Sequence, residues 1–406
     1  MYSVGGKIVS VGNKFPENRV NTLTFEVTGS TFPNFTQSFS SFIINFSDPM
    51  SFRINYGDGV VESFTNQSLY SIRANQNPGD VHEYIDGNTS SRFVTFEFES
   101  LLNIVYIQIN FVSVIGFFPV EVGLIKNLNA LSLRRTNFDS FPESFFDLRN
   151  LDTITLRQAL SFKFPTIFDG IFLNSLTSLT LEKSFNLSDH ISSNFFKINQ
   201  LKDTLTFLNI QGTDLEDLPK EIEELQELTE FWGLFSLFSA MPPEVLALKK
   251  LENLKLGNIS RPGGLVNTAM LEFGSNSNKI TTLSLRLRNV DLFDLSTKWL
   301  GLKSLKQIEQ FQYLVGDTAR FDEFINQIYI LSTVNGFLNT SSTEAQLEEF
   351  PEQFRDIVWG DSSLTQTGTI EAPPQFVQGS NNGNPINQGQ KIYVLVNNYG
   401  HTITTS

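Results

Sequence analysis

Apolar residues follow one spacing four times in the middle of the chain. Each copy begins with an apolar residue and a proline, at Phe118-Pro119, Phe141-Pro142, Leu218-Pro219 and Met241-Pro242. Apolar residues then stand three, six and nine positions after the proline, as Val122, Ile125 and Leu128 do in the first copy. Because proline has no N–H group, it suits a turn better than the interior of a sheet. The spacing therefore predicts a turn and a return segment in every copy.

The pattern L-x-x-L-x-L predicts one strand in each copy. Copies begin at Leu128, Leu151, Leu176, Leu205, Leu251 and Ile280. A weaker first copy is Leu102/Val105/Ile107, with Asn110 behind it, and in the copy Leu228/Phe231 the third apolar residue is replaced by Gly233. Neither a strand nor a return segment can bury its apolar face alone, so the copies must stack. The residues expected in the core include Leu131, Leu133, Ile154, Leu156, Leu179, Leu208, Leu254 and Leu283.

These eight copies resemble leucine-rich repeats over about residues 100–305. Their starting points lie between 23 and 29 residues apart, which is the spacing of that family. The resemblance implies a right-handed solenoid with one parallel strand for each repeat. It also implies a surface that binds another molecule, although the sequence does not name the partner.

Residues 1–98, which precede the repeats, are predicted to form β structure. Short aromatic and β-branched runs occur at Thr24–Val27, Phe42–Phe46, Phe52–Tyr56, Val60–Phe64 and Phe93–Phe98. Tyr56-Gly57-Asp58-Gly59, followed by His82-Glu83-Tyr84 and an alternating strand, resembles PKD domains, although the usual Trp-Asp is Ile54-Asn55 here. The resemblance implies an Ig-like β-sandwich. We favour Asp58 as a turn-forming residue, with a cation ligand as the alternative.

The segment after the repeats is expected to cap the solenoid. One helical face is predicted from Phe321, Phe324, Ile325, Ile328 and Leu331, and a second amphipathic stretch runs from about Thr343 to Trp359. Further on, Lys391–Val396 is expected to be a strand, Asn397–Gly400 a turn and His401–Thr405 a partner strand. The predicted fold class is therefore α+β in four parts: a β-sandwich (1–98), a leucine-rich repeat solenoid with a parallel β-sheet (99–305), a helical cap (306–360) and an Asn/Gln/Gly-rich segment ending in a β-hairpin (361–406).

Composition excludes several classes of partner. The formal net charge is -14 with only 29 Lys and Arg residues, so a nucleic acid is not expected as a partner. No run of 18 apolar residues is present, so we expect no membrane insertion, and the N-terminus has no apolar run of the length of an export signal. The absence of cysteine excludes disulfides, cysteine–zinc sites and thiol catalysis.

Candidate catalytic groups do not form a recognisable set. The three histidines, His82, His190 and His401, lie in different segments, and none has a partner at a diagnostic spacing. The densest acidic run surrounds Leu218-Pro219 and is best explained as a solvated face: Asp214, Glu216, Asp217, Glu221, Glu223, Glu224 and Glu227. We therefore expect a protein that is not an enzyme and that needs no cofactor and no metal.

The residues between the core positions of the strands are the candidate binding residues. On the face that the repeats would make concave they are Tyr106, Arg134, Arg157, Glu182, Gln211, Trp232, Lys255 and Arg286. Arg134 and Arg157 are expected on adjacent strands, which would suit an anionic group of a partner. Trp232 either stands on this face or turns into the core, since Gly233 makes its strand irregular.

The function hypothesis is a binding and structural protein of a bacteriophage virion, in or beside the tail. An Ig-like module joined to a solenoid, low charge, no cysteine and many Asn, Ser, Thr and Phe residues are all typical of virion appendages. The terminal hairpin would then attach to another subunit. The alternatives are a bacterial cell-surface adhesin with leucine-rich repeats and a cytoplasmic interaction protein.

Overall fold

The computed structural model describes most of the 406-residue chain. The described residues are 2–4, 7–9, 21–29, 31–32, 41–73, 82–84, 91–110, 114–158, 174–182, 201–213, 215, 217–234, 238, 242–257, 273, 279–286, 299, 302, 304–311, 322–323, 325–330, 332, 358–359, 369–379 and 381–403. They fall into two compact units, and the division lies inside strand β13 (Thr153–Arg157). The first unit is Met1–Ile154 with Ala159–Pro165, and the second is Thr155–Gln158 with Thr166–Ser406.

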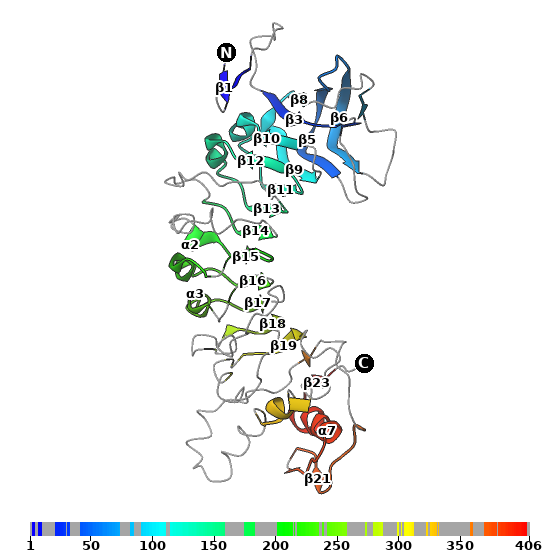
Figure 1. Cartoon of the computed structure of the whole chain (residues 1–406), viewed down its shortest axis with the longest axis vertical. Helices are drawn as coiled ribbons and strands as arrows, with labels where there is room; N and C mark the ends of the chain where they lie inside the picture. The colour runs from blue at the N-terminus through cyan, green and yellow to red at the C-terminus, as the bar shows by residue number, and fades with distance from the viewer. Residues whose placement is uncertain are drawn as a thin grey trace. The chain divides into compact units, whose positions relative to one another are not determined.

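The first unit contains a mostly antiparallel sheet built around one long strand. This strand is β5 (Ser41–Asn55), which pairs with β6 (Val61–Arg73), β8 (Arg92–Phe98) and β9 (Ile104–Asn110). β3 (Thr22–Val27) joins β8 to β10 (Val114–Phe117). Since β9 is also the first repeat strand, strands from both sides of residue 98 share one hydrogen-bonded sheet, as Figure 1 shows. The domain boundary at 98 stays a prediction.

Aromatic side chains fill the core under this sheet. Phe25, Phe42 and Phe96 are buried, and the rings of Phe42 and Phe96 stack with their centroids 5.1 Å apart. A two-stranded sheet, β4 (Thr31–Phe32) with β7 (His82–Glu83), supplies Phe32, whose ring meets those of both Phe42 and Phe96. The second layer of the described part is thus small, and the PKD-like sandwich stays a prediction.

Two details of the predicted strands in the first unit are wrong. The runs Phe42–Phe46 and Phe52–Tyr56 were expected as separate strands, but all of their residues except Tyr56 lie in the one strand β5, whose pairing with β6 shifts register on both sides of Met50. The first repeat was placed two residues too early. Its core positions are Ile104, Ile107 and Ile109, all fully buried, whereas Leu102 is 49% exposed.

The physical reason for the shifted register is a short turn before β9. Leu101–Asn103 forms the 3-10 helix η3, and the side chain of Ser100 accepts a hydrogen bond from the N–H group of Leu102. The strand therefore begins at Ile104, and Leu131 of β11 (Ala130–Arg134) pairs with Ile107. Both registers fit L-x-x-L-x-L, so the sequence pattern could not distinguish them.

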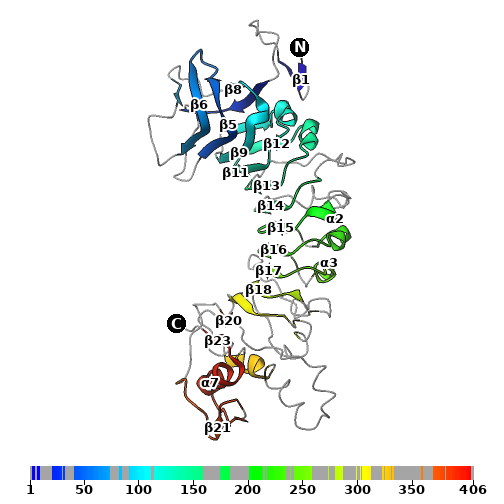
Figure 2. The ribbon, with the colours of Figure 1, turned by 180° about the vertical axis from the view of Figure 1, so that it is seen from behind.

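Each proline of the repeat stands at a turn, as predicted, and the segment that follows it is a short helical turn. Pro119, Pro142 and Pro219 precede η4 (Val120–Leu124), η5 (Glu143–Asp147) and η7 (Lys220–Glu224), and Pro242 precedes α3 (Pro243–Leu246). The carbonyl oxygen of each of these prolines accepts a hydrogen bond from the N–H group three residues later. Two of the turns are preceded by short strands that pair in parallel, β10 before Pro119 and β12 (Asn137–Ser140) before Pro142. Figure 2 shows α2 (Leu201–Thr204) and α3 on the side of the second unit away from its strands.

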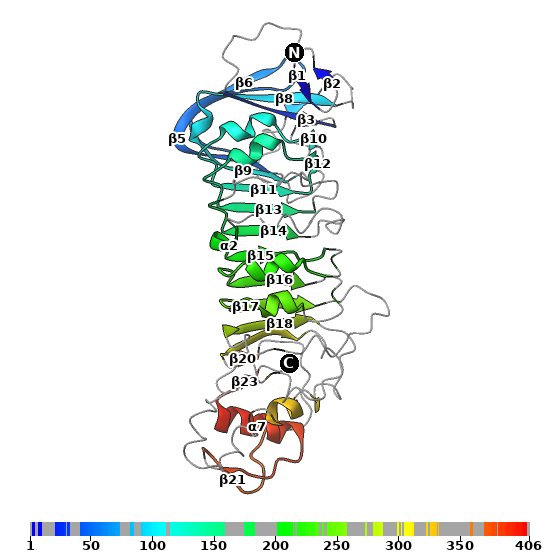
Figure 3. The same ribbon diagram turned by 90° about the vertical axis from the view of Figure 1, so that its left-hand side faces the viewer.

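The second unit contains a parallel ladder of repeat strands. In order these are β14 (Ser178–Glu182), β15 (Phe207–Asn209), β16 (Glu230–Leu234), β17 (Asn253–Gly257) and β18 (Thr282–Arg286), which lie side by side in Figure 3. Neighbouring strands pair in parallel throughout. All eight predicted core residues, in both units, have exposed fractions of 0–1%. The parallel solenoid is therefore confirmed.

The ladder continues beyond residue 305, where the repeats were expected to end. β19 (Gln307–Phe311) pairs in parallel with β18, with a register shift after Leu283, and β20 (Val358–Trp359) pairs in parallel with β19. The shift inserts one residue into the spacing, so this copy does not match the repeat template. The boundaries at 305 and 360 stay predictions.

The predicted terminal hairpin is wrong. Lys391–Val396, expected as a strand, lies in α7, an α-helix that spans Gln388–Tyr399. Its buried residues include Ile392, Leu395 and Tyr399, which are three and four positions apart and so share one helical face. The β-branched residues in this run hid the helical period.

The residues that begin and end α7 are typical helix-capping residues. The side chain of Asn387 accepts a hydrogen bond from the N–H group of Gln390, and Gly400 ends the helix with a left-handed φ of 67°. Beyond the helix, β23 (Thr402–Ile403) pairs in parallel with β20 and not in a hairpin.

A second helix packs beside α7. Residues 325–330 are helical, with Ile325 and Ile328 buried, which confirms that part of the predicted helix. Phe321, Phe324 and Leu331 lie outside the described residues, as does the expected stretch from Thr343 except β20. Lys391 Nζ donates a hydrogen bond to Asn326 Oδ1 at 2.8 Å across the two helices. Their capping role stays a prediction.

Candidate functional site

The strands of the second unit present two rows of side chains away from the leucine core. Register places Thr180, Asn209, Trp232, Lys255 and Ser284 in one row. The second row contains Ser178, Phe207, Glu230, Asn253 and Thr282. We call these two rows the strand face. Since each position is fixed by the ladder, the strand face holds its side chains in a fixed order.

Trp232 stands on the strand face, so the alternative that it turns into the core is wrong. Its neighbours Phe231 and Gly233 are buried, whereas Trp232 is half-buried. A Cβ atom on Gly233 would lie 3.0 Å from side-chain atoms of Leu256 and Phe238, so the space of a third apolar residue is already filled. Phe238 therefore fills the core position that Gly233 leaves empty. The strand still alternates between core and outward residues, and Trp232 keeps its outward position.

The indole of Trp232 is the centre of a small cluster on the strand face. The ring of Phe207 meets it edge-on, with the centroids 4.9 Å apart. Lys255 places its Nζ 4.3 Å from the centroid of the indole, which is a cation–π distance. These three half-buried side chains, Phe207, Trp232 and Lys255, form what we call the aromatic cluster.

Charged residues beside the aromatic cluster already form ion pairs or hydrogen bonds within the chain. Arg157 Nε donates a hydrogen bond to Glu182 Oε2 at 2.6 Å, and its guanidinium also forms an ion pair with that carboxylate. Asn253 Nδ2 lies 3.5 Å from Glu230 Oε2 on the next strand. Because Glu182 neutralises Arg157, an anionic partner group is not required there.

The other predicted binding residues are spread over the chain. Tyr106 and Arg134 belong to the first unit, and burial raises the pKa of the Tyr106 hydroxyl, which donates a hydrogen bond to Gln108 Oε1 at 2.6 Å. Gln211 lies in the turn after β15, where its N–H group donates to Asn209 Oδ1. The side chain of Arg286 lies outside the described residues. Only Trp232 and Lys255 of the eight therefore fall into the aromatic cluster.

Phe207 is the one residue of the aromatic cluster that was not among the predicted binding residues. The signal was present, since Phe207 immediately precedes the core residue Leu208 and so stands at an outward position of its strand. An aromatic residue at such a position is unusual on a solvated face. The pairing of Phe207 with Trp232 depends on the register between two strands that lie 23 residues apart in sequence.

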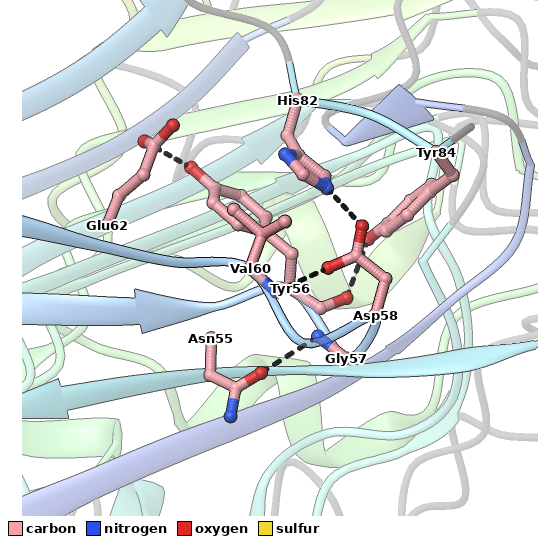
Figure 4. Close-up of polar contacts among 8 residues, drawn as sticks. All are labelled: Asn55, Tyr56, Gly57, Asp58, Val60, Glu62, His82 and Tyr84. Atoms are coloured by element: carbon pink, nitrogen blue, oxygen red, sulfur yellow. Dashed lines mark hydrogen bonds and ion pairs between the residues drawn. The ribbon is translucent and has the colours of Figure 1, made fainter. Parts of the chain in front are cut away.

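A second polar cluster surrounds the Gly57-Asp58-Gly59 turn of the first unit (Figure 4). Asp58 Oδ1 accepts a hydrogen bond from the N–H group of Val60 at 3.0 Å, and Asp58 Oδ2 lies 2.7 Å from His82 Nε2. Burial tends to raise the pKa of the Asp58 carboxyl, but the hydrogen bonds from Val60 and His82 outweigh burial, and the pKa is lowered. The turn-forming reading of Asp58 is thus confirmed by its contacts.

Aromatic rings enclose the Asp58–His82 pair. The imidazole of His82 stacks on the ring of Tyr56, with the centroids 4.0 Å apart, and Tyr84 donates a hydrogen bond to the carbonyl oxygen of Tyr56 at 3.1 Å. Burial, and then the hydrogen bond to Glu62, raises the pKa of the Tyr56 hydroxyl (Figure 4). The described residues contain no group of three His, Cys, Asp or Glu side chains that could hold a metal ion. The cluster therefore joins the turn to β7.

Two further expectations concern the acidic run and the membrane. The described members of the run, Asp217, Glu221, Glu223, Glu224 and Glu227, are exposed or half-buried, which fits a solvated face. Glu227 pairs with Lys250 at 2.6 Å. In the described part of the chain, every helix falls short of the length and apolar character needed to cross a bilayer.

Comparisons with known proteins give weak matches to structures with leucine-rich repeats. No protein-family model and no curated protein matches the sequence. A leucine-rich repeat protein of Leptospira interrogans is 15% identical with a TM-score of 0.33, and the match covers 64% of this chain and 65% of that one. The internalin InlF of Listeria monocytogenes is 14% identical with a TM-score of 0.37, over 65% and 75% of the two chains. The plant peptide hormone receptor RGFR1, solved in complex with RGF2, is 19% identical with a TM-score of 0.32, over 49% and 30%. The repeat fold of this chain rests on the register of its own strands.

Proposed function

We propose that this chain is a non-enzymatic protein-binding protein that holds its partner on the strand face of the second unit. The observation that carries the proposal is the aromatic cluster of Phe207, Trp232 and Lys255, half-buried on an otherwise small and polar face. Tryptophan is enriched among the residues that dominate binding energy in interfaces. A rigid sheet reduces the ordering cost of association, because the anchors are already in place.

The charges around the cluster indicate what kind of partner surface fits. Glu182 balances Arg157, and Lys255 lies over the indole, so the centre of the face has no strong field of either sign. The small neighbours Thr180, Asn209 and Ser284 leave the indole as the most prominent group in its row. We infer that the partner contributes an apolar or aromatic side chain to the indole and polar groups around it.

Display selection followed by point variants tests the proposal. Peptides from a random displayed library are selected on the full chain, and the Kd of each selected peptide is measured for the wild type and for Trp232→Ala. A loss of about 2 kcal/mol, roughly thirtyfold in Kd, is expected. Phe207→Ala should weaken binding of the same peptides. Lys250→Ala should not, because Lys250 lies in the turn before β17 and not on the strand face. Selected peptides that bind all three variants equally would refute the strand-face proposal.

We propose that the chain is a component of a bacteriophage virion and lies in or beside the tail. Low charge, no cysteine and an abundance of Asn, Ser, Thr and Phe support this setting. A bacterial cell-surface adhesin and a cytoplasmic interaction protein would use the same face, so gene neighbourhood decides among them. Capsid, portal and tail genes alongside would support the virion, and an anchor or export sequence in the gene would favour the adhesin.

A further inference from the structure

β6 is the outermost described strand of the sheet in the first unit. Residues Ser41–Asn45 of β5 lie between β6 and β9, and residues Phe52–Asn55 lie between β6 and β8 (Figure 1). Among the described strands, β5 is the only one that pairs with β6. Along the other edge of β6, backbone N–H and C=O groups therefore point away from the described sheet.

This edge has few of the features that prevent another strand from pairing with it. β6 spans 13 residues and contains no lysine and no proline, which proteins often place on exposed edges. Its charged residues are one acidic and one basic side chain, Glu62 and Arg73. Val61 and Leu69 are 50% and 45% exposed. A long, weakly charged edge of this kind is a template for a further strand.

β6 is not a regular strand, and this limits which strand can pair with it. Phe64 pairs with Phe52 and Gln67 pairs with Met50, so β6 has one residue more than β5 between these two pairs. Asn66 lies in this bulge and has a left-handed φ of 53°. A partner strand with a strict period of two residues loses its register across such a bulge.

The aromatic contacts show that β6 also bends around its middle. Phe64 and Tyr70 are six residues apart, which is about 20 Å in a straight strand. Their rings nevertheless meet edge-on, with the centroids 5.4 Å apart, and the ring of Phe52 contacts both. A strand that pairs along the whole of β6 must therefore bend at the same place.

A second copy of β6 has the matching irregularity and the matching bend. Five residues of β6 stand opposite the β5 residues on the aromatic side of the sheet: Glu62, Phe64, Gln67, Tyr70 and Ile72. The steps between them are two, three, three and two residues, so the pattern is the same in both directions from Gln67. An antiparallel copy centred on Gln67 therefore aligns these positions with each other along the whole strand.

The side chains are compatible in this alignment. Phe64 of one copy stands opposite Tyr70 of the other, and cross-strand aromatic pairs stabilise sheets. Glu62 stands opposite Ile72, and Arg73 stands opposite Val61. Neither charged residue of β6 thus meets a like charge across the pair.

We propose that β6 pairs antiparallel with β6 of a second copy, about a two-fold axis at Gln67, and that the chain is a homodimer joined through its first unit. In such an interface every residue pair occurs twice. The proposal does not depend on partner binding at the strand face, which belongs to the second unit.

A single engineered cysteine tests the position of the axis, because the chain has no cysteine of its own. Gln67→Cys places two thiols opposite each other, with a Cα separation of about 4.5–5.5 Å that lies within the range for a disulfide. Val61→Cys, exposed on the same strand, is the matched control, since the two copies of Val61 stand at opposite ends of the paired strands. After mild oxidation, non-reducing gels should show at least about fivefold more linked dimer for Gln67→Cys.

Light scattering after size-exclusion chromatography tests the dimer without a disulfide. The wild type should have the mass of two chains at micromolar concentration. Leu69→Lys adds a charge to the edge and should raise the dissociation constant of the dimer at least about tenfold. Phe93→Lys, at a position that is 49% exposed on β8, should leave that constant unchanged, and circular dichroism checks that both variants fold.

Three results would overturn the proposal. The first is a monomeric wild type that gives equal linkage for the two cysteine variants, in which case the edge of β6 is covered by other residues of its own chain. The second is a dimer that Leu69→Lys leaves unchanged, which would place the interface elsewhere. The third is a dimer in which Val61→Cys links better than Gln67→Cys, because the axis would then lie at another residue.

Discussion

Gly233 leaves room in the core for the side chain of Phe238. A Cβ atom on the glycine would come within 3.0 Å of Phe238 Cε2, and Phe238 itself is buried. The third apolar position of this repeat is therefore filled by a residue five positions later in the sequence. Because Phe238 fills this core position, the strand stays regular and Trp232 stays on the strand face.

Gly233→Ala should destabilise the second unit by about 1–3 kcal/mol, because the added methyl group has no free volume. Gly233→Ala combined with Phe238→Ala should cost less than the sum of the two single changes, since removing the ring makes room for the methyl. Urea unfolding of the four proteins measures this coupling. Strict additivity would show that the two residues do not compete for the same space.

Leu131→Ala in the first unit and Leu254→Ala in the second should each cost about 2–5 kcal/mol. Both side chains are fully buried, so each change leaves a cavity. Ile109→Ala, a core position only in the observed register of the first repeat, should behave in the same way, whereas Leu102→Ala should stay within about 0.5 kcal/mol because its side chain is largely exposed. Chemical unfolding followed by circular dichroism measures these changes. A large loss for Leu102→Ala with a small loss for Ile109→Ala would restore the earlier register of the first repeat.

Asp58→Asn should destabilise the first unit, and the loss should depend on pH. The pKa of Asp58 is lowered in the folded state, so its ionised form stabilises the fold at every pH above the ordinary carboxyl pKa of about 3.9. This contribution is lost as pH falls through the lowered value. The difference in unfolding free energy between wild type and Asp58→Asn should therefore be constant above about pH 5 and shrink below about pH 4.

Urea unfolding at a series of pH values measures that difference. Asp48→Asn serves as the control, because Asp48 is exposed and its contact is with the neighbouring Ser47. A difference for Asp58→Asn that grows on acidification would contradict the lowered pKa.

Asn387→Ala should weaken α7 by about 1 kcal/mol, because the N–H group of Gln390 loses its acceptor. Gly400→Ala should cost about 1–2 kcal/mol, since a left-handed residue with a Cβ atom is strained. Hydrogen exchange across residues 388–399 measures both changes, and Gln378→Ala, at an exposed position, is the control. Unchanged exchange in both variants would argue that these residues do not form the ends of a helix.

The repeat fold could be predicted because each leucine position serves a core that is the same in every copy. The register of the first repeat could not, since Leu102 and Val105 match the template as well as Ile104 and Ile107 do. The helix α7 was missed because Ile392–Val396 has the composition of a strand. Its helical signals are local and lie at the two ends, at Asn387 and Gly400.

The candidate site was predictable in part. The outward position of Trp232 follows from alternation along its strand, once the core residues are known. Its contact with Phe207 and the ion pair between Arg157 and Glu182 follow from alignment between strands, which pairwise spacing in one sequence does not supply.

The hydrogen bonds where the chain enters each strand all run one way. Within each unit, N–H groups of one repeat donate to a carbonyl oxygen of the repeat before it, as Asn129 does to Val105 and Thr229 to Thr206. Side chains of Asn127, Asn150, Thr206, Thr229 and Thr281 add donors in the same sense. A repeat leaving the ribosome therefore finds the acceptors for these donors on a repeat already synthesised. Beyond the strand entries the sense reverses, as the N–H group of Ile210 donates to the carbonyl oxygen of Trp232, so each repeat also needs the one that follows it.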